Sequence, residues 1–319
     1  MFVIFLFNAI RFSTTFMFGC TGETITEKGG NLNLGIPGIM CVGAVGGCIG
    51  ESIYLKSLSD ISRINPFLAV LIPILFAMLF SGALGMLYCF LTVTLRCNQN
   101  VTGLAITTFG VGFTNFFITL VDRTNFNVAS KSFTKFFPIQ DASNWFVKLF
   151  LSYGVMVYLA VIIAIIAAII LNKTRLGLNL KAVGENPATA DAAGISVTAY
   201  KYGATGIGSA IAGLGGLFYI MDYLNGSWEY SIDAMGWLAI ALVIFSIWRP
   251  NWGILGSILF GALYIAPSYL NVSFSQKELL KMIPYIVTIF VLIVSSIRNK
   301  KENQPPASLG LSYFREERY

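Results

Sequence analysis

Residues 155–171 read VMVYLAVIIAIIAAIIL, a run that contains no charged side chain. About 20 consecutive apolar residues match the thickness of a bilayer's hydrocarbon core, so this run predicts a membrane-spanning helix. Runs of the same kind recur along the chain. The predicted spans lie near 2–21, 34–55, 67–95, 100–121, 148–171, 201–221, 233–248, 252–271 and 282–297. We therefore expect an all-α polytopic membrane protein with about nine (eight to ten) transmembrane helices.

The composition supports the same class. Of the 319 residues, 56% are hydrophobic and 11% are charged, and the mean hydropathy is +0.73. Soluble globular proteins carry about 25% charged residues, so the soluble classes are excluded. Nine spans leave no room for a separate soluble domain. We expect a single transmembrane domain over 1–319, with a long loop at 172–200 and a tail at 298–319.

The net charge of +6 does not indicate nucleic-acid binding, because the basic residues are scattered between apolar runs. In a membrane protein such an excess is typical of cytoplasmic loops, which are enriched in lysine and arginine. If the loop 172–200 is cytoplasmic, alternation of the nine spans places the tail inside and the N-terminus outside. The segment 122–147 is then the largest external loop.

Several kinds of chemistry are excluded. The chain has no histidine and no Cys-x-x-Cys pair, so we expect no metal site. It has neither a phosphate-binding Gly-x-x-x-x-Gly-Lys-Ser/Thr loop nor a Gly-x-Ser-x-Gly elbow, so we expect no catalytic residues and no cofactor in this chain. Ionisable residues inside spans are few, with Arg11 and Glu51 the main candidates. An ion-driven carrier would carry more of them, so the energy source is expected outside this chain.

The segment NLNLGIPG at 31–38 opens the second span with two glycines and a proline. These residues leave backbone groups without helical partners, which is tolerated at membrane depth only where protein or a water-filled cavity satisfies them. Interrupted helices often line the substrate path of transporters. The alternative is a simple turn at the membrane surface.

The segment GENPATADAAG at 184–194 predicts a two-turn helix inside the long loop. Asn186 suits the N-cap, Pro187 the first helical position and Gly194 the C-terminal cap. Glu185 and Asp191 carry negative charge near the N-terminus, which the helix dipole favours. Its alanines would let another surface approach closely, so the segment is suited to docking; an ordinary linker is the alternative.

A third segment, SAIAGLGG at 209–216, lies within the sixth span. Small residues at helical spacing allow two helices in lipid to approach closely. We therefore expect a tight helix–helix contact here, and this pattern does not indicate a ligand.

The long loop also carries a family resemblance. It contains TRLG at 174–177, KAVGENP at 181–187 and ADAAGI at 190–195. This pattern resembles the cytoplasmic loop of permeases of ABC importers of the ribose/branched-chain amino-acid type. More narrowly, the chain resembles the second permease subunit of purine-nucleoside (basic membrane protein-associated) importers. Further matching points are EKGGNLNLGI at 27–36, AIALVIF at 239–245, WRP at 248–250, MIPY at 282–285 and PASLGLSY at 306–313.

The resemblance implies the partners and the location. They are a second, related permease subunit in a heterodimer, an ABC ATPase that uses ATP on the cytoplasmic side, and an external substrate-binding lipoprotein. The chain itself would be a multi-pass protein of a bacterial plasma membrane. The resemblance also implies that 184–194 is the coupling helix that docks on the ATPase. The residues assigned to coupling are Gly184, Glu185, Asn186, Pro187, Ala190, Asp191 and Gly194.

The sequence departs from the family pattern at three places, so the resemblance does not identify the transported solute. Pro37 replaces a usual carboxylate, Thr107 stands where an asparagine is usual, and Ser246-Ile247 replaces a usual Gly-Arg or Gly-Lys. The resemblance implies an importer permease for nucleosides that works by alternating access. The alternatives are an importer for a flavin, a sugar or another small polar solute, and an ATP-independent carrier or channel.

Four uncharged polar residues are candidates for the substrate pathway: Asn31, Asn33, Thr107 and Thr108. A nucleoside presents hydroxyls and base edges that need hydrogen-bond partners once they leave water, and each unmet group costs about 1–3 kcal/mol. The alternative is that these side chains bond to neighbouring backbone or helices, as Asn and Thr often do in membranes.

Overall fold

The computed structural model describes residues 2–134, 145–270, 273–298 and 304–315, and all regular secondary structure in these ranges is helical. Within these ranges, seven helices are long and apolar enough to cross a membrane. They are α1 (Phe2–Lys28), α2 (Ile36–Ser57), α3 (Pro66–Cys89), α4 (Gln99–Leu120), α7 (Val155–Lys173), α10 (Val197–Phe218) and α12 (Pro250–Ile265), which the following turn extends to a 20-residue span, Pro250–Tyr269. The prediction of a polytopic all-helical membrane protein is therefore confirmed.

The other two predicted spans correspond to shorter helices. They are α11 (Ile232–Phe245), with 14 residues, and α14 (Ile283–Arg298), with 16 residues. A run of about 20 residues is needed to cross the hydrocarbon core upright, so seven crossings are supported by length and nine are not. The seventh predicted span is short because the chain turns sharply after Phe245. Ile247 and Trp248 both have positive φ, at 56° and 51°, which ends the helix before Pro250 starts the next.

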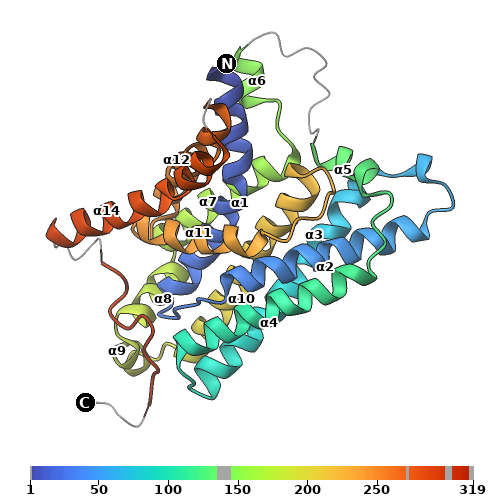
Figure 1. The fold of residues 1–319 in the computed structure, drawn as a ribbon. Coiled ribbons are helices and arrows are strands. Elements are labelled where there is room, and N and C mark those ends of the chain that lie inside the picture. The colour runs from blue at the N-terminus through green and yellow to red at the C-terminus, as the bar shows by residue number, and fades with distance from the viewer. Residues whose placement is uncertain (1, 135–144, 271–272, 299–303, 316–319) are drawn as a thin grey trace.

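The remaining elements lie at the two ends of the bundle. They are α5 (Phe126–Thr134), α6 (Trp145–Phe150), α8 (Arg175–Glu185), α9 (Pro187–Ala192), α13 (Phe274–Leu280) and the 3₁₀ turns Ile61–Arg63 and Ala266–Tyr269. Two π-helical turns, Phe90–Thr94 and Tyr219–Tyr223, extend α3 and α10. The start of α1 lies at the same end as α5 and α6, whereas α8, α9 and the segment 304–315 lie at the opposite end (Figure 1). This arrangement fits an odd number of crossings.

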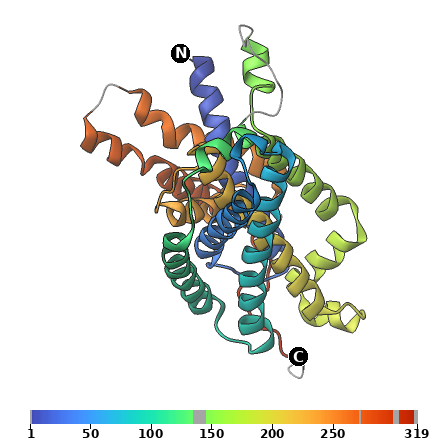
Figure 2. The ribbon, with the colours of Figure 1, turned by 90° about the vertical axis from the view of Figure 1, so that its right-hand side faces the viewer.

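The centre of the bundle is made by α2 and α10, which are the most buried of the seven long helices. They pack against each other and against α3, α10 also packs against α1, and α2 lies in the middle of the side view (Figure 2). Their contacts are close because glycines face one another. A methyl group added to Gly43 would collide with the backbone of Gly213, and one added to Gly22 would collide with Gly208. The tight packing predicted for 209–216 is confirmed.

The outer helices keep much of their apolar surface exposed. α3, α4, α7 and α12 are each less than half buried along their most apolar stretch, although α3 and α7 are more apolar than the core helices and α4 is as apolar. In water such a surface would be unstable, whereas hydrocarbon or another helical subunit can cover it. These helices therefore form the outer wall of the bundle.

Candidate functional site

The loop segment predicted to be a capped helix forms α9. The side chain of Asn186 accepts a hydrogen bond from the backbone N–H of Thr189 at 3.0 Å, as an N-cap does. Gly194 has φ of +81°, a conformation that favours glycine. Beside it, the backbone N–H of Ile195 donates to the carbonyl of Ala190 at 3.0 Å, which closes the C-terminal end. The predicted caps are confirmed.

Only part of this segment faces outward. Its exposed residues are Glu185, Asn186, Thr189, Ala192, Ala193 and Gly194. Gly184 is buried, and Ala190 is buried in a small apolar cluster with Val183 and Val197. Of the residues assigned to coupling, these two therefore support the loop from inside, because a short helix packed on the bundle can present only one face to a partner.

The segment 304–315 lies against this loop and fastens it. The backbone N–H of Ser308 donates to the carbonyl of Gly184 at 3.0 Å, and the Ser308 hydroxyl donates to the same oxygen. At the far end, the hydroxyl of Tyr313 donates to Asp191 Oδ2 at 2.9 Å, and Arg315 Nε lies 3.2 Å from that oxygen. Asp191 is therefore engaged with the tail. Glu185 is the exposed acidic group of the segment.

The tail also reaches the start of the second and fourth helices. The backbone N–H of Gly310 donates to the carbonyl of Gly30 at 3.3 Å, and Gln99 Nε2 donates to the carbonyl of Leu311 at 3.3 Å. The tail thus connects α9 with the α1–α2 connection and with the first turn of α4. The α1–α2 connection and the first turn of α4 are therefore linked to α9 through hydrogen bonds with the tail.

The α1–α2 connection at residues 29–35 is a buried, non-helical stretch of chain. Its backbone is satisfied by other side chains: Leu32 N–H to Gln99 Oε1 (2.7 Å), Leu32 O from Tyr88 OH (2.6 Å), Asn33 N–H to Glu23 Oε1 (3.1 Å) and Leu34 O from Thr107 Oγ1 (2.8 Å). Protein groups therefore fulfil the requirement stated for an interrupted helix at membrane depth. The connection is buried rather than a turn on the surface.

The four pathway candidates divide into two groups. Asn31 and Asn33 are fully buried, and Thr107 is buried beside them. Asn31 Nδ2 donates to Thr205 Oγ1 at 2.9 Å, while Asn31 Oδ1 and Asn33 Nδ2 have no partner in the described structure. Thr108 is exposed on α4 and bonds only to the carbonyl one helical turn earlier. The structure thus brings three of the four together and separates Thr108 from them.

Buried ionisable residues are more numerous than the sequence indicated. Glu23 and Glu27 are buried on α1, because that helix continues to Lys28 rather than ending near residue 21. Glu27 accepts the indole N–H of Trp248. Lys201 and Asp222 are buried along α10 and its π turn. The expectation that Arg11 and Glu51 are the main ionisable groups within the spans was therefore too narrow.

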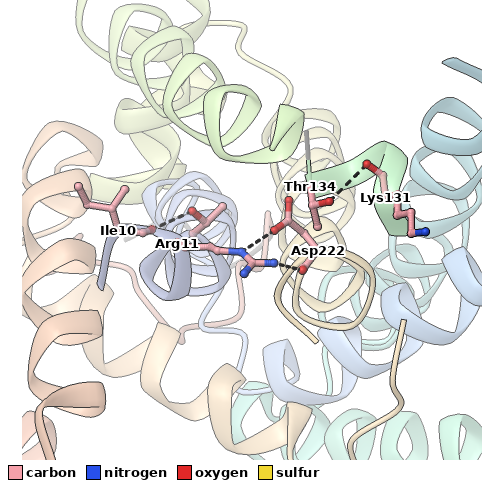
Figure 3. Close-up of polar contacts among 6 residues, drawn as sticks. Ile10, Arg11, Lys131, Thr134 and Asp222 are labelled. Atoms are coloured by element: carbon pink, nitrogen blue, oxygen red, sulfur yellow. Dashed lines mark hydrogen bonds and ion pairs between the residues drawn. The ribbon is translucent and has the colours of Figure 1, made fainter. Parts of the chain in front are cut away.

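Arg11 has a specific partner that the sequence did not reveal. Arg11 Nε lies 2.9 Å from Asp222 Oδ1, and its terminal nitrogen donates to the Asp222 carbonyl (Figure 3). The Asp222 side chain is 1% exposed. It stands on the π-helical turn Tyr219–Tyr223, a distortion that is frequent at functional sites. The pair joins α1 to the end of α10 beside α5, to which Lys131 and Thr134 belong (Figure 3).

Comparison with known proteins gives a consistent result. NupC of Lactococcus lactis, a nucleoside ABC transporter permease protein, is 29% identical over 91% of both chains. TsgC13 of Haloferax volcanii, provisionally named a glucose ABC transporter permease protein, is 29% identical over 98% of both chains. NupQ of Bacillus subtilis, a guanosine ABC transporter permease protein, is 28% identical over 85% of both chains. No solved structure matches the chain significantly.

A family model covers nearly the whole bundle. The model described as "Branched-chain amino acid transport system / permease component" matches residues 5–292, from the first turns of α1 into α14. This stretch includes α9, the buried α1–α2 connection and the pair formed by Arg11 and Asp222. The chain therefore belongs to the family of branched-chain amino acid transport system permease components.

Proposed function

We propose that this chain is one membrane-spanning subunit of an ATP-driven importer for nucleosides. The proposal rests on one observation: relatives with this role align with the chain over most of its length. Proteins named as nucleoside or guanosine ABC transporter permeases align over 85–91% of its length. The bundle described above agrees with this role, because it consists almost wholly of membrane-spanning helices that surround buried polar groups.

Coupling to ATP hydrolysis is proposed to pass through α9. An ABC ATPase on the cytoplasmic side would contact its exposed face, which includes Glu185, Asn186 and Ala192. Movement of α9 would then be transmitted through the tail to the α1–α2 connection. The contacts of Tyr313 with Asp191 and of Gly310 with its backbone partner in that connection support this route. In this scheme the loop 172–200 faces the cytoplasm, and α11 and α14 complete nine crossings by local thinning of the bilayer.

The remaining partners follow from the same proposal. A second, related permease would cover the exposed apolar wall of the bundle, and an external binding lipoprotein would deliver cargo at the end where α5 and α6 lie. NupB and NupC of Lactococcus lactis, both named nucleoside ABC transporter permease proteins, support a pair of unlike permeases. The setting would be a bacterial plasma membrane.

The cargo is proposed to meet the buried polar groups beside the α1–α2 connection. Asn31 Oδ1 and Asn33 Nδ2 are buried and have no partner in the described structure, so the oxygen can accept and the amide nitrogen can donate a hydrogen bond. Neutral groups suit transport, because cargo must leave as readily as it enters. A sugar is the second candidate cargo, because TsgC13 aligns over 98% of the chain.

A reconstituted uptake assay tests the proposal. The full chain, a second permease, the ATPase and the binding protein are placed in proteoliposomes, and uptake of labelled guanosine and glucose is measured with and without ATP. We expect uptake of guanosine that depends on ATP and on every subunit. Uptake of glucose alone would assign the sugar cargo, and uptake without ATP would contradict the importer mechanism.

A matched set of variants tests the pathway. Asn33→Ala and Thr107→Val remove buried polar groups, whereas Thr108→Val removes an exposed hydroxyl from the same helix as Thr107. We expect the first two to change the half-saturation concentration or the cargo preference and the third to behave like the parent. If Asn33→Ala and Thr107→Val assemble normally and transport like the parent, these residues only support the fold.

A further inference from the structure

A basic pocket lies where several membrane-spanning helices end. It has a volume of about 420 Å³, and its lining includes the basic residues Lys28, Lys181 and Arg249. No acidic residue is among the described residues that line it. Three basic groups from α1, α8 and the start of α12 therefore converge on one space, although they are distant in sequence.

The position of this basic pocket coincides with one boundary of the membrane. Lys28 is the last residue of α1, Leu171 lies in the last turn of α7, and Arg249 directly precedes α12. These three helices are all long and apolar enough to cross a bilayer, so their ends mark the level at which hydrocarbon gives way to water. Trp248 and Trp252 also line the pocket, and Trp252 is 57% exposed. Tryptophan is enriched at this level of membrane proteins.

The electrostatics of the basic pocket favour an anion. Lys28, Lys181 and Arg249 line the same space, and burial together with the neighbouring Arg249 guanidinium lowers the pKa of Lys181. The acidic groups that act on Lys28 are Glu185 and Glu27, and the carboxylate of Glu27 is engaged with the indole of Trp248. The N-terminus of α12 adds its partial positive charge, because Arg249 is its N-cap residue.

We propose that this basic pocket binds the phosphate headgroup of an anionic phospholipid in the leaflet on the side of α9. Phosphate suits the three basic groups, and an acyl chain suits the apolar part of the lining, which includes Leu171 and Trp252. Free inorganic phosphate would contact only the basic side chains and not the apolar part of the lining. The acidic surface of a partner protein is the other possible occupant, and the helix ends favour the lipid because they place the pocket at the bilayer edge.

Fluorescence quenching tests the lipid site without transport, cargo or ATPase, so its outcome is independent of the proposed function. The full chain is placed in nanodiscs of phosphatidylcholine that contain increasing amounts of phosphatidylglycerol with brominated acyl chains. The difference between the parent and a Trp252→Phe variant isolates the signal of Trp252. We expect brominated phosphatidylglycerol to quench this signal at lower mole fractions than brominated phosphatidylcholine.

Replacing single basic side chains tests whether the basic pocket causes the preference for phosphatidylglycerol. Lys181→Gln and Arg249→Gln should each weaken the apparent affinity for phosphatidylglycerol about fivefold, since one basic residue contributes about 1 kcal/mol to binding of anionic lipid. Lys173→Gln is the matched control, because Lys173 is an exposed lysine at the end of α7 that does not line the pocket. It should bind phosphatidylglycerol like the parent.

Three outcomes would overturn the proposal. The first is equal quenching of Trp252 by the two brominated lipids, and the second is parent-like affinity in both Lys181→Gln and Arg249→Gln. The third concerns the source of the phosphate. If inorganic phosphate added to nanodiscs that contain brominated phosphatidylglycerol abolishes the extra quenching of Trp252, the pocket takes a soluble anion instead of a lipid.

Discussion

Replacing Asp191 with alanine should release the end of the tail and leave its middle in place. Asp191 Oδ2 accepts the hydroxyl of Tyr313 at 2.9 Å and lies 3.2 Å from Arg315 Nε. Both contacts are lost in Asp191→Ala. Alanine is the best helix former, so α9 itself should persist. The effect should therefore be confined to the last described residues of the chain.

The size of the effect follows from the two contacts. A hydrogen bond to a charged group contributes about 1.5–3 kcal/mol to stability. The side chain of Arg315 is 74% exposed, so its ion pair contributes about 0–1 kcal/mol because water screens it. Together they predict a loss of about 2 kcal/mol in the docking of residues 311–315, which corresponds to an opening about 30 times more frequent.

Amide hydrogen exchange measured by mass spectrometry checks this prediction. Exchange at 311–315 should rise about 30-fold in Asp191→Ala, while 306–310 stays protected because Ser308 remains bonded to the carbonyl of Gly184. Glu185→Ala is the control, since it removes an exposed acidic group of the same loop. Parent-like exchange at 311–315 in Asp191→Ala, or the same rise in Glu185→Ala, would refute the reasoning.

Two predictions concern the packing and the buried charges, and both are measured as thermal unfolding of the purified full chain. Gly43→Ala should cost about 1–3 kcal/mol of stability, since the new methyl group meets the backbone of Gly213, whereas Gly112→Ala, with open space around it, should cost nothing. An unfolding midpoint as high in Gly43→Ala as in Gly112→Ala would contradict the close packing. Arg11→Gln should cost about 3–5 kcal/mol by leaving the buried Asp222 carboxylate unpaired, and adding Asp222→Asn should restore part of it. A double variant less stable than Arg11→Gln would show that the two charges do not act as a pair.

Features that depend on neighbouring residues were predictable from sequence. The caps of α9 are confirmed because Asn186 and Gly194 act within one helical turn. The long apolar helices are confirmed for the same reason, since a continuous apolar run is itself the signal. Their ends were less predictable, because α1 continues past its apolar run where other helices bury Glu23 and Glu27.

Features that join distant segments could not be predicted. Arg11 and Asp222 are 211 positions apart, and nothing near either residue indicates the other. The engagement of Asp191 by Tyr313 is of the same kind, so its charge was predicted to be available for docking. The inward position of Ala190 depends on which face of α9 packs against the bundle. The sequence indicated the helices and their caps, whereas tertiary contacts decide which side chains are accessible.

The contacts of the tail also bear on the order of synthesis. Residues 306–315 follow every described helix of the bundle in the chain, yet they contact α8 through Ser308, the α1–α2 connection through Gly310 and α9 through Tyr313. These contacts cannot form until the ribosome has made all preceding helices. A chain that stops early, or that fails to insert its last helices, therefore presents an α9 loop without this support. The buried contacts of this loop are therefore completed only after the helices of the bundle have been synthesised.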